Sequence, residues 1–328
     1  MPLRKTVLRT VGLVAAAALV GFAAFDASQA TTGTTARSKV IISAPAAPGG
    51  GWDLAARESQ TAMRAGGSVN NVQVVNVPGA GGTIGLGQII ELAGDPTQLM
   101  MTGTVMMGAI TVNNSPHSLL ETTPIARLAD DYEVFIVPTD SPFETLDDLL
   151  AVWAADPSGI SIGGGSLGGT DHMLGGLVAK AADIDPGEMN YIPYAGGGEV
   201  LTALLSNTVD LGISGYNEFR DQIEAGNLRA LAVSAEEPIE GIDTPTFIEQ
   251  GINVALPNWR GMVAPPGISD EERQELIDIV SEMVKTEEWA SAIERNRWAD
   301  TFLTGDDFTE FIKDEQVRID AIIKDVGL

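Results

Sequence analysis

The sequence predicts an α/β protein built from two units, and three observations predict it. Short apolar runs alternate with helical patterns from residue 39 to residue 155, which is the order expected of a mostly parallel sheet with helices on both faces. The same alternation begins again at residue 159 and continues to residue 234. Glycine-rich segments stand where the predicted strands pass into the predicted helices. We therefore expect two α/β units with glycine-rich loops at the carboxyl ends of their strands.

The period of the apolar residues places the elements in order along the chain. The predicted strands are residues 39–43, 71–77, 98–104, 133–138, 159–165, 190–194, 209–214 and 228–234. The predicted helices are residues 53–63, 82–93, 145–155, 170–182, 198–206 and 217–225. The tail from Ser269 is predicted to be helical, because Ser269 with Glu272 three residues later forms a capping-box pattern and Gly327 is a typical helix C-cap.

The N-terminal segment is predicted to be a secretory signal peptide rather than part of the fold. Residues 1–30 contain three basic residues, then about fifteen apolar residues at 11–25, then the small residues Ser28 and Ala30. The apolar stretch is shorter than the roughly twenty residues that a membrane-spanning helix needs. We expect cleavage near Ala30 and a periplasmic or otherwise extracytoplasmic product.

Charge and composition exclude several classes of partner and chemistry. The 328 residues carry a formal charge of −26, which becomes −28 when residues 1–30 are removed, so nucleic acid is excluded as a partner. The acidity indicates a solvated surface. The chain has no cysteine, so disulfides, a lipid-bearing cysteine and thiol chemistry are excluded as well.

Four glycine-rich segments occupy strand-to-helix junctions. In open α/β sheets, ligands bind at the carboxyl edge of the strands, where helix N-termini present unpaired N–H groups and a partial positive charge. Glycine could also serve only to permit tight turns, but four such loops in one chain favour a ligand-binding edge. The four segments are residues 47–53, 77–85, 163–172 and 194–200.

The sequence gives little support for a catalytic triad, a metal site or a dinucleotide-binding site. Residues 164–168 match the G-x-S-x-G nucleophile elbow around Ser166, but the triad order requires a histidine after both the serine and the acid. His117 lies upstream, and His172 stands at the start of the helix that follows Ser166. No histidine or carboxylate cluster has metal-ligand spacing, and residues 79–85 fail the dinucleotide fingerprint. We therefore expect no catalytic set, no metal and no cofactor.

Eight segments together resemble a known family. In order they are "APGGGWDLAAR", "NVPGAGGTIG", "TPIARLADDYEVFIVPTDSPFETLDDL", "GGGSLGGTDH", "YIPYAGGGE", "LRALAVSAEE", "PTFIEQG" and "NWRGMVAPPG". They resemble the substrate-binding proteins of tripartite tricarboxylate transporters, the TctC or Bug family. The resemblance covers nearly the whole chain after the predicted signal peptide.

The resemblance implies a two-lobed periplasmic-binding-protein fold of type II, a "Venus flytrap". It would capture a small di- or tricarboxylate such as citrate between its lobes and deliver it to membrane permease subunits. The resemblance places the first lobe at residues 38–130 plus 235–328 and the second at residues 131–234. We expect a monomer. A secreted sensor that feeds a signalling kinase, and a secreted hydrolase that uses Ser166, are the alternatives.

The resemblance also implies which residues contact ligand. In the first βα loop, the positions that match the family's ligand-binding residues are Gly50, Gly51, Trp52 and Asp53. In the glycine-rich loop of the second lobe they are Ser166, Gly168, Gly169 and Thr170. Further candidates are His172, Tyr194, Tyr216 and Glu218. Trp52 and the segment 214–219 depart from the commonest pattern of the family, so the ligand need not be the commonest one. Trp52 could instead pack beneath its loop, and His172 could instead be a polar contact at a helix start.

The mode of binding expected from the sequence relies on backbone donors. Few basic residues lie near the glycine loops, and we expect Arg57 to point away and Arg260 to support a strand. Backbone N–H groups at residues 51–53 and 168–170 would then hold the carboxylates. Gly169→Val is expected to weaken binding at least tenfold, and Arg260→Gln to weaken it less.

Overall fold

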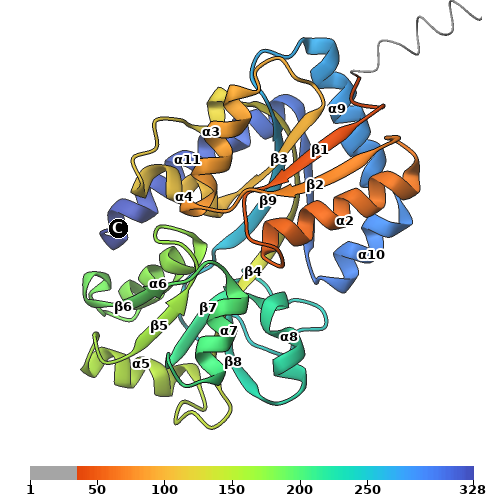
Figure 1. Ribbon diagram of the computed structural model, residues 1–328. Helices are drawn as coiled ribbons and strands as arrows, with labels where there is room; N and C mark the ends of the chain where they lie inside the picture. The colour runs from red at the N-terminus through yellow and green to blue at the C-terminus, as the bar shows by residue number, and fades with distance from the viewer. Residues whose placement is uncertain (1–34) are drawn as a thin grey trace, which may run out of the picture.

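The computed structural model describes residues 35–328 as two α/β lobes that lie end to end (Figure 1). The predicted signal peptide at residues 1–30 lies outside the described residues. Within residues 35–328, no helix is both long enough and apolar enough to cross a bilayer. The two-lobed α/β fold expected from the sequence is therefore present.

Lobe I is built on a mixed sheet in the order β2-β1-β3-β9-β4, with β10 on the other side of β4. Strands β1, β2 and β3 are parallel, whereas β9 and β10 run antiparallel to their neighbours. The strands are β1 (Val40–Ala44), β2 (Val72–Asn76), β3 (Gln98–Gly103), β9 (Pro257–Ala264) and β10 (Ala299–Thr304).

The helices of lobe I pack against this sheet with caps that the sequence encodes. Ser269 and Glu272 form the predicted capping box of α9, and Gly327 ends α11 with φ 77° in the left-handed region. The helices are α2 (Gly51–Gly66), α3 (Thr83–Glu91), α4 (Thr104–Val112), α9 (Asp270–Met283), α10 (Glu287–Arg295) and α11 (Gly305–Val326), with short 3-10 turns η1 (Ala80–Gly82) and η2 (Leu119–Glu121).

Lobe II repeats the strand-helix alternation on a smaller sheet in the order β4-β7-β5-β6, with β8 also on β4. Strands β5, β6 and β7 are parallel. The elements are α5 (Leu146–Ala155), β5 (Ser161–Gly164), α6 (Thr170–Ala181), η3 (Pro186–Glu188), β6 (Asn190–Pro193), α7 (Gly197–Leu205), β7 (Leu211–Gly215), α8 (Tyr216–Glu224) and β8 (Leu228–Val233).

Strand β4 (Thr123–Pro138) belongs to both sheets. Its residues up to Tyr132 pair with β9, and its residues from Glu133 onward pair with β7 and β8. The chain comes back beside it at Ser234, whose backbone N–H donates to Glu133 O at 2.9 Å and whose hydroxyl donates to Leu256 O at 3.0 Å. The lobes are thus joined by paired strands, and the exact residue boundaries given above stay a prediction.

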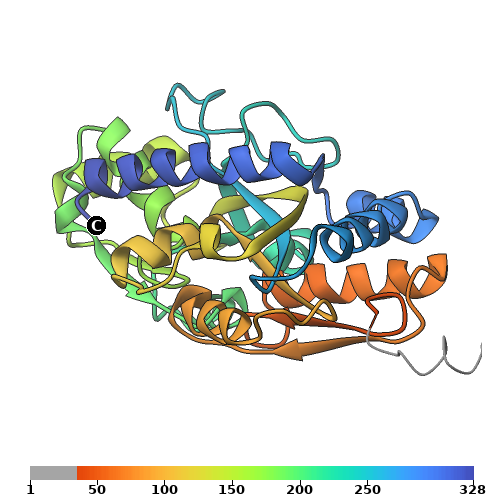
Figure 2. The ribbon, with the colours of Figure 1, turned by 90° about the horizontal axis from the view of Figure 1, so that it is seen from above.

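The C-terminal helix α11 gives a further connection between the lobes. It runs along one side of lobe I, and its last turn reaches the green helices of lobe II (Figure 2). There Lys180 of α6 forms an ion pair with Asp325, and a Cβ at Gly176 would lie 2.9 Å from Val326 Cβ. The close packing of α11 on α6 leaves no room for a larger side chain at this glycine.

Four sequence expectations need correction. The sheet is mixed rather than mostly parallel, because the strands that connect the lobes, β4 and β9, run against their neighbours. Strand β4 begins ten residues before the expected start at Glu133. The tail after Ser269 is not all helical, because it contains β10, which pairs with β4. Helix α4, between β3 and β4, was not expected from the sequence.

Candidate functional site: a cavity between the lobes

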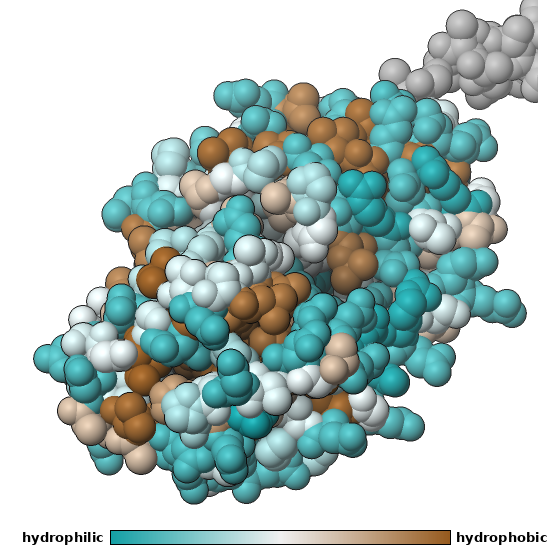
Figure 3. Space-filling model, turned by 60° about the horizontal axis from the view of Figure 1, so that its bottom comes forward, coloured by the Kyte–Doolittle hydropathy of each residue, from teal (hydrophilic) through white to brown (hydrophobic). Residues whose placement is uncertain are grey.

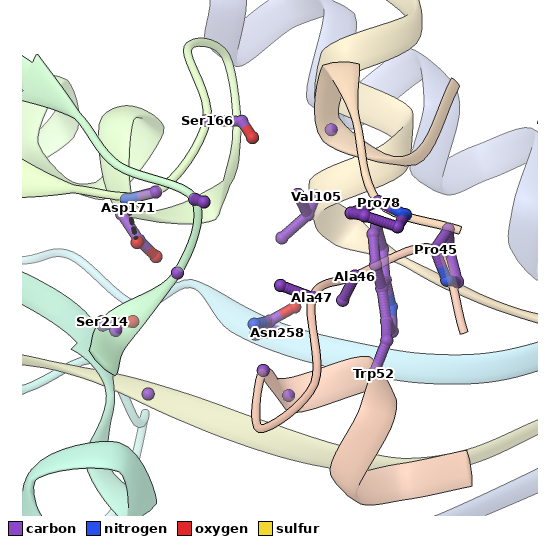
Figure 4. Close-up of a pocket in the computed structure, with 18 of the residues that line it drawn as sticks. Pro45, Ala46, Ala47, Trp52, Pro78, Val105, Ser166, Asp171, Ser214 and Asn258 are labelled. Atoms are coloured by element: carbon purple, nitrogen blue, oxygen red, sulfur yellow. Dashed lines mark hydrogen bonds between the residues drawn. The ribbon is translucent and has the colours of Figure 1, made fainter. Parts of the chain in front are cut away.

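The four glycine-rich junctions meet around one cavity of about 360 Å³. Lobe I contributes residues 45–47 and 50–52 after β1, residues 78–81 after β2, and Val105 of α4. Lobe II contributes Gly165 and Ser166 after β5 and residues 195–197 after β6. Figure 4 shows Trp52, Pro78 and Val105 on one side of this space and Ser166, Asp171 and Ser214 on the other. The volume is in the range of sites for small molecules.

The first loop is held in shape by Asp53, in the first turn of α2. Asp53 Oδ2 accepts from Gly49 N at 2.8 Å and from Arg57 Nε at 2.9 Å, and Asp53 Oδ1 accepts from Asn76 Nδ2 at 2.8 Å. Burial alone would raise the pKa of Asp53, but the hydrogen bonds from Arg57, Gly49 and Asn76 hold it below its usual value. Asp53 therefore shapes the loop, and it does not line the cavity.

Trp52 combines both roles considered from the sequence. Its side chain is 5% exposed and its ring lies against Gly82, where an added Cβ would be 2.9 Å from Trp52 Cζ3. It also lines the cavity, beside Pro45 and Pro78 (Figure 4). A buried indole under two proline-containing loops gives lobe I a rigid, apolar wall.

The second loop is held by the first turn of α6. Gly165 N donates to Asp171 Oδ2 at 2.6 Å, Gly168 N donates to His172 Nδ1 at 3.2 Å, and Gly169 N donates to Ser166 O at 2.9 Å. Three of the backbone donors of this loop are therefore used within the loop. This leaves fewer of them for a ligand than the sequence suggested.

His172 supports this loop through its contacts with Gly168 and Tyr191. Its ring stacks on Tyr191 with centroids 4.1 Å apart, and Tyr191 donates its hydroxyl to Gly165 O at 3.0 Å. Burial lowers the pKa of His172 to about 4, so the ring is neutral near pH 7 and its Nδ1 can accept from Gly168. Because that nitrogen is occupied, His172 acts here as a structural contact.

The back wall of the cavity is made by the strands that connect the lobes. Asn258 Nδ2 of β9 donates to Glu133 Oε1 of β4 at 2.6 Å, and both side chains are buried. Arg260, also on β9, forms an ion pair with Asp131 at 2.7 Å, with both side chains under 8% exposed. Arg260 thus lies in the strand as expected but also lines the cavity.

Three carboxyl groups converge on this wall. Glu133, Asp171 and Glu218 come from β4, α6 and α8 and all line the cavity. Burial raises the pKa of Glu133 well above its usual value and raises that of Asp171 to about 7, while the hydrogen bond from Gly165 N partly opposes the shift of Asp171. Burial also raises the pKa of Glu218, although Ser214 donates a hydrogen bond to it.

The structure separates the predicted site residues into two groups. The residues that line the cavity are Gly50, Gly51, Trp52, Ser166 and Glu218. The residues that lie outside its wall are Asp53, Gly168, Gly169, Thr170, His172, Tyr194 and Tyr216. The second group builds the loops or the core: Tyr216, for example, is 7% exposed and packs in the core of lobe II. Whether any of them contacts ligand stays a prediction.

Sequence reasoning missed several residues of the wall. These are mainly Val105, Glu133, Asp171, Ser214, Asn258 and Arg260, whereas residues 78–81 belong to a glycine-rich segment already expected at the ligand-binding edge. The sequence offered one signal for Glu133, because this residue directly precedes the apolar run 134–137. In the structure Glu133 is 1% exposed. A charged residue at such a position is seldom buried without a purpose.

A protein-family model matches most of the chain. The model described as the tripartite tricarboxylate transporter family receptor, TctC, matches residues 56–328. The chain belongs to this family. Among its relatives, this TctC receptor is 27% identical to the protein BugT of Bordetella pertussis over 291 residues, which cover 86% of this chain and 87% of BugT.

Solved structures share the fold of this TctC receptor. The periplasmic binding protein BugD matches with a TM-score of 0.80 and 22% identity over 88% of this chain and 98% of BugD. MatC from Rhodopseudomonas palustris, solved with bound malate, matches with a TM-score of 0.79 and 19% identity over 87% of this chain and 99% of MatC. At these identities the likeness establishes the two-lobed fold.

Proposed function

We propose that this TctC receptor is an extracytoplasmic solute-binding protein that captures a small carboxylate between its lobes and delivers it to the permease of a tripartite tricarboxylate transporter. The observation that carries the proposal is the cavity at the carboxyl ends of strands from both lobes, in a chain of the receptor family. Malate in MatC supports a carboxylate as the solute. Periplasmic export by the predicted signal peptide belongs to the same proposal.

Lobe I offers donors that suit a carboxylate. Helix α2 begins at Gly51, and Gly51 and Trp52 both line the cavity, so the N–H groups of the first helical turn face the solute. The hydroxyls of Ser166 and Ser214 lie on the opposite side (Figure 4). Arg260 Nε is buried without a hydrogen-bond partner in the described chain and can donate as well. We therefore expect Arg260→Gln to weaken binding more than Gly169→Val, the reverse of the sequence-based expectation.

The lobes already touch beside the cavity, which is how a flytrap would enclose its solute. A Cβ at Gly108 of α4 would lie 2.0 Å from Gly168 O of lobe II, and a Cβ at Gly81 would lie 3.7 Å from Ser166 Cβ. A solute that contacts both lobes favours this closed arrangement over an open one. Binding should therefore make the protein more compact in solution.

A hydrolase that uses Ser166 finds little support. A serine nucleophile needs a base that can accept its proton, and His172 Nδ1 already accepts from Gly168 while its ring stacks on Tyr191. Capture without conversion is the function that this geometry favours.

The test is a thermal-shift and calorimetric screen of purified protein with di- and tricarboxylates. At a hundredfold excess over its dissociation constant, a solute that binds only the folded state adds about 2.7 kcal/mol of stability. We expect a clear rise in melting temperature, with the solute recovered unchanged. Failure of every carboxylate to bind would refute the proposal. Turnover of a carboxylate ester that disappears in Ser166→Ala would favour the hydrolase.

A further inference from the structure

The cavity that should hold an anion carries more acidic than basic side chains. Among the lining residues in the described part of the chain, Glu133, Asp171 and Glu218 are acidic and Arg260 is the one cation. The guanidinium of Arg260 is already paired with Asp131. A simple dicarboxylate would therefore enter a space whose side-chain groups outside that ion pair are carboxyls: each one that is ionised repels it, and none offers it a compensating positive charge.

The second observation is a set of buried acceptors that lack donors. Glu133 Oε2 and Asn258 Oδ1 are both buried without a hydrogen-bond donor in residues 35–328. The orientation of the Asn258 amide is fixed, because its Nδ2 donates to Glu133 Oε1 at 2.6 Å. Buried acceptors of this kind are nearly always satisfied by a donor from protein, water or ligand. A carboxylate supplies only acceptors, whereas an ammonium supplies three N–H donors and a positive charge.

Three occupants could satisfy these carboxyls. Protons held on Glu133 and Asp171, whose pKa values burial raises, would neutralise these carboxyls but leave Asn258 Oδ1 without a donor. A metal ion is disfavoured, because in the described ranges no group of three or more side chains is arranged to hold one. An organic cation in the cavity would have Glu133, Asp171, Asn258 and Glu218 all among the side chains that line its space.

We propose that the solute carries a cationic nitrogen that bears N–H groups and lies among Glu133, Asp171, Glu218 and Asn258. This inference rests on the proposed solute-binding function and narrows the solute to a zwitterion. Its carboxylate end would meet the first turn of α2 and Arg260 Nε, a buried donor of the wall that lacks a partner among residues 35–328. The unpartnered donor and the unpartnered acceptors thus suit opposite ends of one small molecule.

The experiment uses calorimetry on wild-type protein. It compares probes of equal carbon number that carry different numbers of carboxylate and amino groups. Each set starts from a dicarboxylate of four to six carbons and its 2-amino derivative. The third probe has one carboxylate of the dicarboxylate replaced by an aminomethyl group, and the fourth is the diamine with the same number of carbons. For five carbons these are glutarate, glutamate, 5-aminopentanoate and cadaverine. We expect at least one amino carboxylate to bind at least tenfold more tightly than the amine-free dicarboxylate of its set.

Variants locate the cationic nitrogen. Glu218→Gln should weaken the best amino carboxylate at least tenfold and leave the affinity for the amine-free dicarboxylate unchanged or higher. Glu224→Gln, a matched change at the exposed end of the same helix α8, should leave both affinities unchanged. Calorimetry in phosphate and in Tris gives a readout that does not require a variant. A cation that displaces protons from the buried carboxyls makes the measured heat depend on the buffer.

The outcomes separate this inference from the proposed function. If dicarboxylates bind as tightly as every amine-bearing probe, the inference is wrong and the carboxylate receptor stands. If diamines bind and no carboxylate does, the cationic site stands and the proposed function is wrong. If no amine-bearing probe binds, or if Glu218→Gln binds the best one like wild type, the inference is wrong.

Discussion

A single methyl group at Gly51 is predicted to disrupt the buried ion pair of the cavity wall. A Cβ at this position would lie 2.3 Å from Arg260 Nη2 and 2.6 Å from Arg260 Nη1, where ordinary contacts need about 3.4 Å or more. The guanidinium must therefore move by about 1 Å. It is fixed in place by Asp131 at 2.7 Å, and both side chains are under 8% exposed.

The magnitude follows from the burial of the pair. Removing one partner of a buried ion pair typically costs about 3–5 kcal/mol, so displacing the guanidinium without removing it should cost roughly 2 kcal/mol. Alanine at the first position of α2 gives back up to about 1 kcal/mol through its helix propensity. We therefore expect Gly51→Ala to lower the free energy of unfolding by about 1–2 kcal/mol and the affinity for the solute at least tenfold.

The assay is chemical denaturation together with calorimetric binding. Gly198→Ala, where an added Cβ meets nothing within 4 Å, is the matched control and should change neither quantity by much. In the background Asp131→Asn with Arg260→Met, which has no ion pair to disturb, Gly51→Ala should cost little. Wild-type stability and affinity in Gly51→Ala would show that Arg260 is not held where the wall requires it.

Three further predictions concern the site and its closure. Ser166→Ala should bind the solute within a few-fold of wild type by calorimetry, because it removes a single neutral hydroxyl from the lining of the cavity; complete loss of binding would give Ser166 a larger role. Gly108→Ala should keep its stability yet bind more weakly and stay expanded in X-ray scattering, because its Cβ would overlap Gly168 O; normal compaction with solute would refute this. The raised pKa of Asp171, about 7, means that the folded state holds a proton the unfolded state releases, so stability should fall between about pH 4 and pH 7. Asp171→Asn should remove up to about 1.4 kcal/mol per pH unit of this slope in denaturation curves, and an unchanged slope would argue against the shift.

Local patterns were enough to predict the alternation of strands and helices and the ligand-facing edge. The four glycine junctions could be predicted to meet because parallel strands align their carboxyl ends, and they do line one cavity. The capping residues Ser269 and Gly327 also depend only on their immediate neighbours, and the structure confirms both.

Features that depend on distant partners could not be predicted in this way. Strand β10 is an edge strand whose only described ladder is with β4, about 170 residues earlier in the chain. Glu133, Asn258 and Arg260 meet in the cavity wall because β4 and β9 pair across more than a hundred residues. A buried ion pair gives no periodic signal in the sequence, so Arg260 was expected only to support its strand.

The surface of the protein is mostly hydrophilic, and the sequence carries a formal charge of −26. Hydrophilic residues cover most of the face seen in Figure 3, and the hydrophobic ones form small separate groups. At physiological salt the Debye length is about 8 Å, so these distant charges are largely screened from the cavity. The charges that decide solute selectivity are therefore those of the wall itself.

The most direct test of solute capture between the lobes is a crystal structure of the protein with the tightest-binding probe of the screen. We predict that the probe lies between the lobes, with its carboxylate at the start of α2 near Gly51 and its other end within hydrogen-bonding distance of Glu133 or Asp171. A probe bound outside this cavity, or held by one lobe alone with the other lobe turned away, would contradict the account.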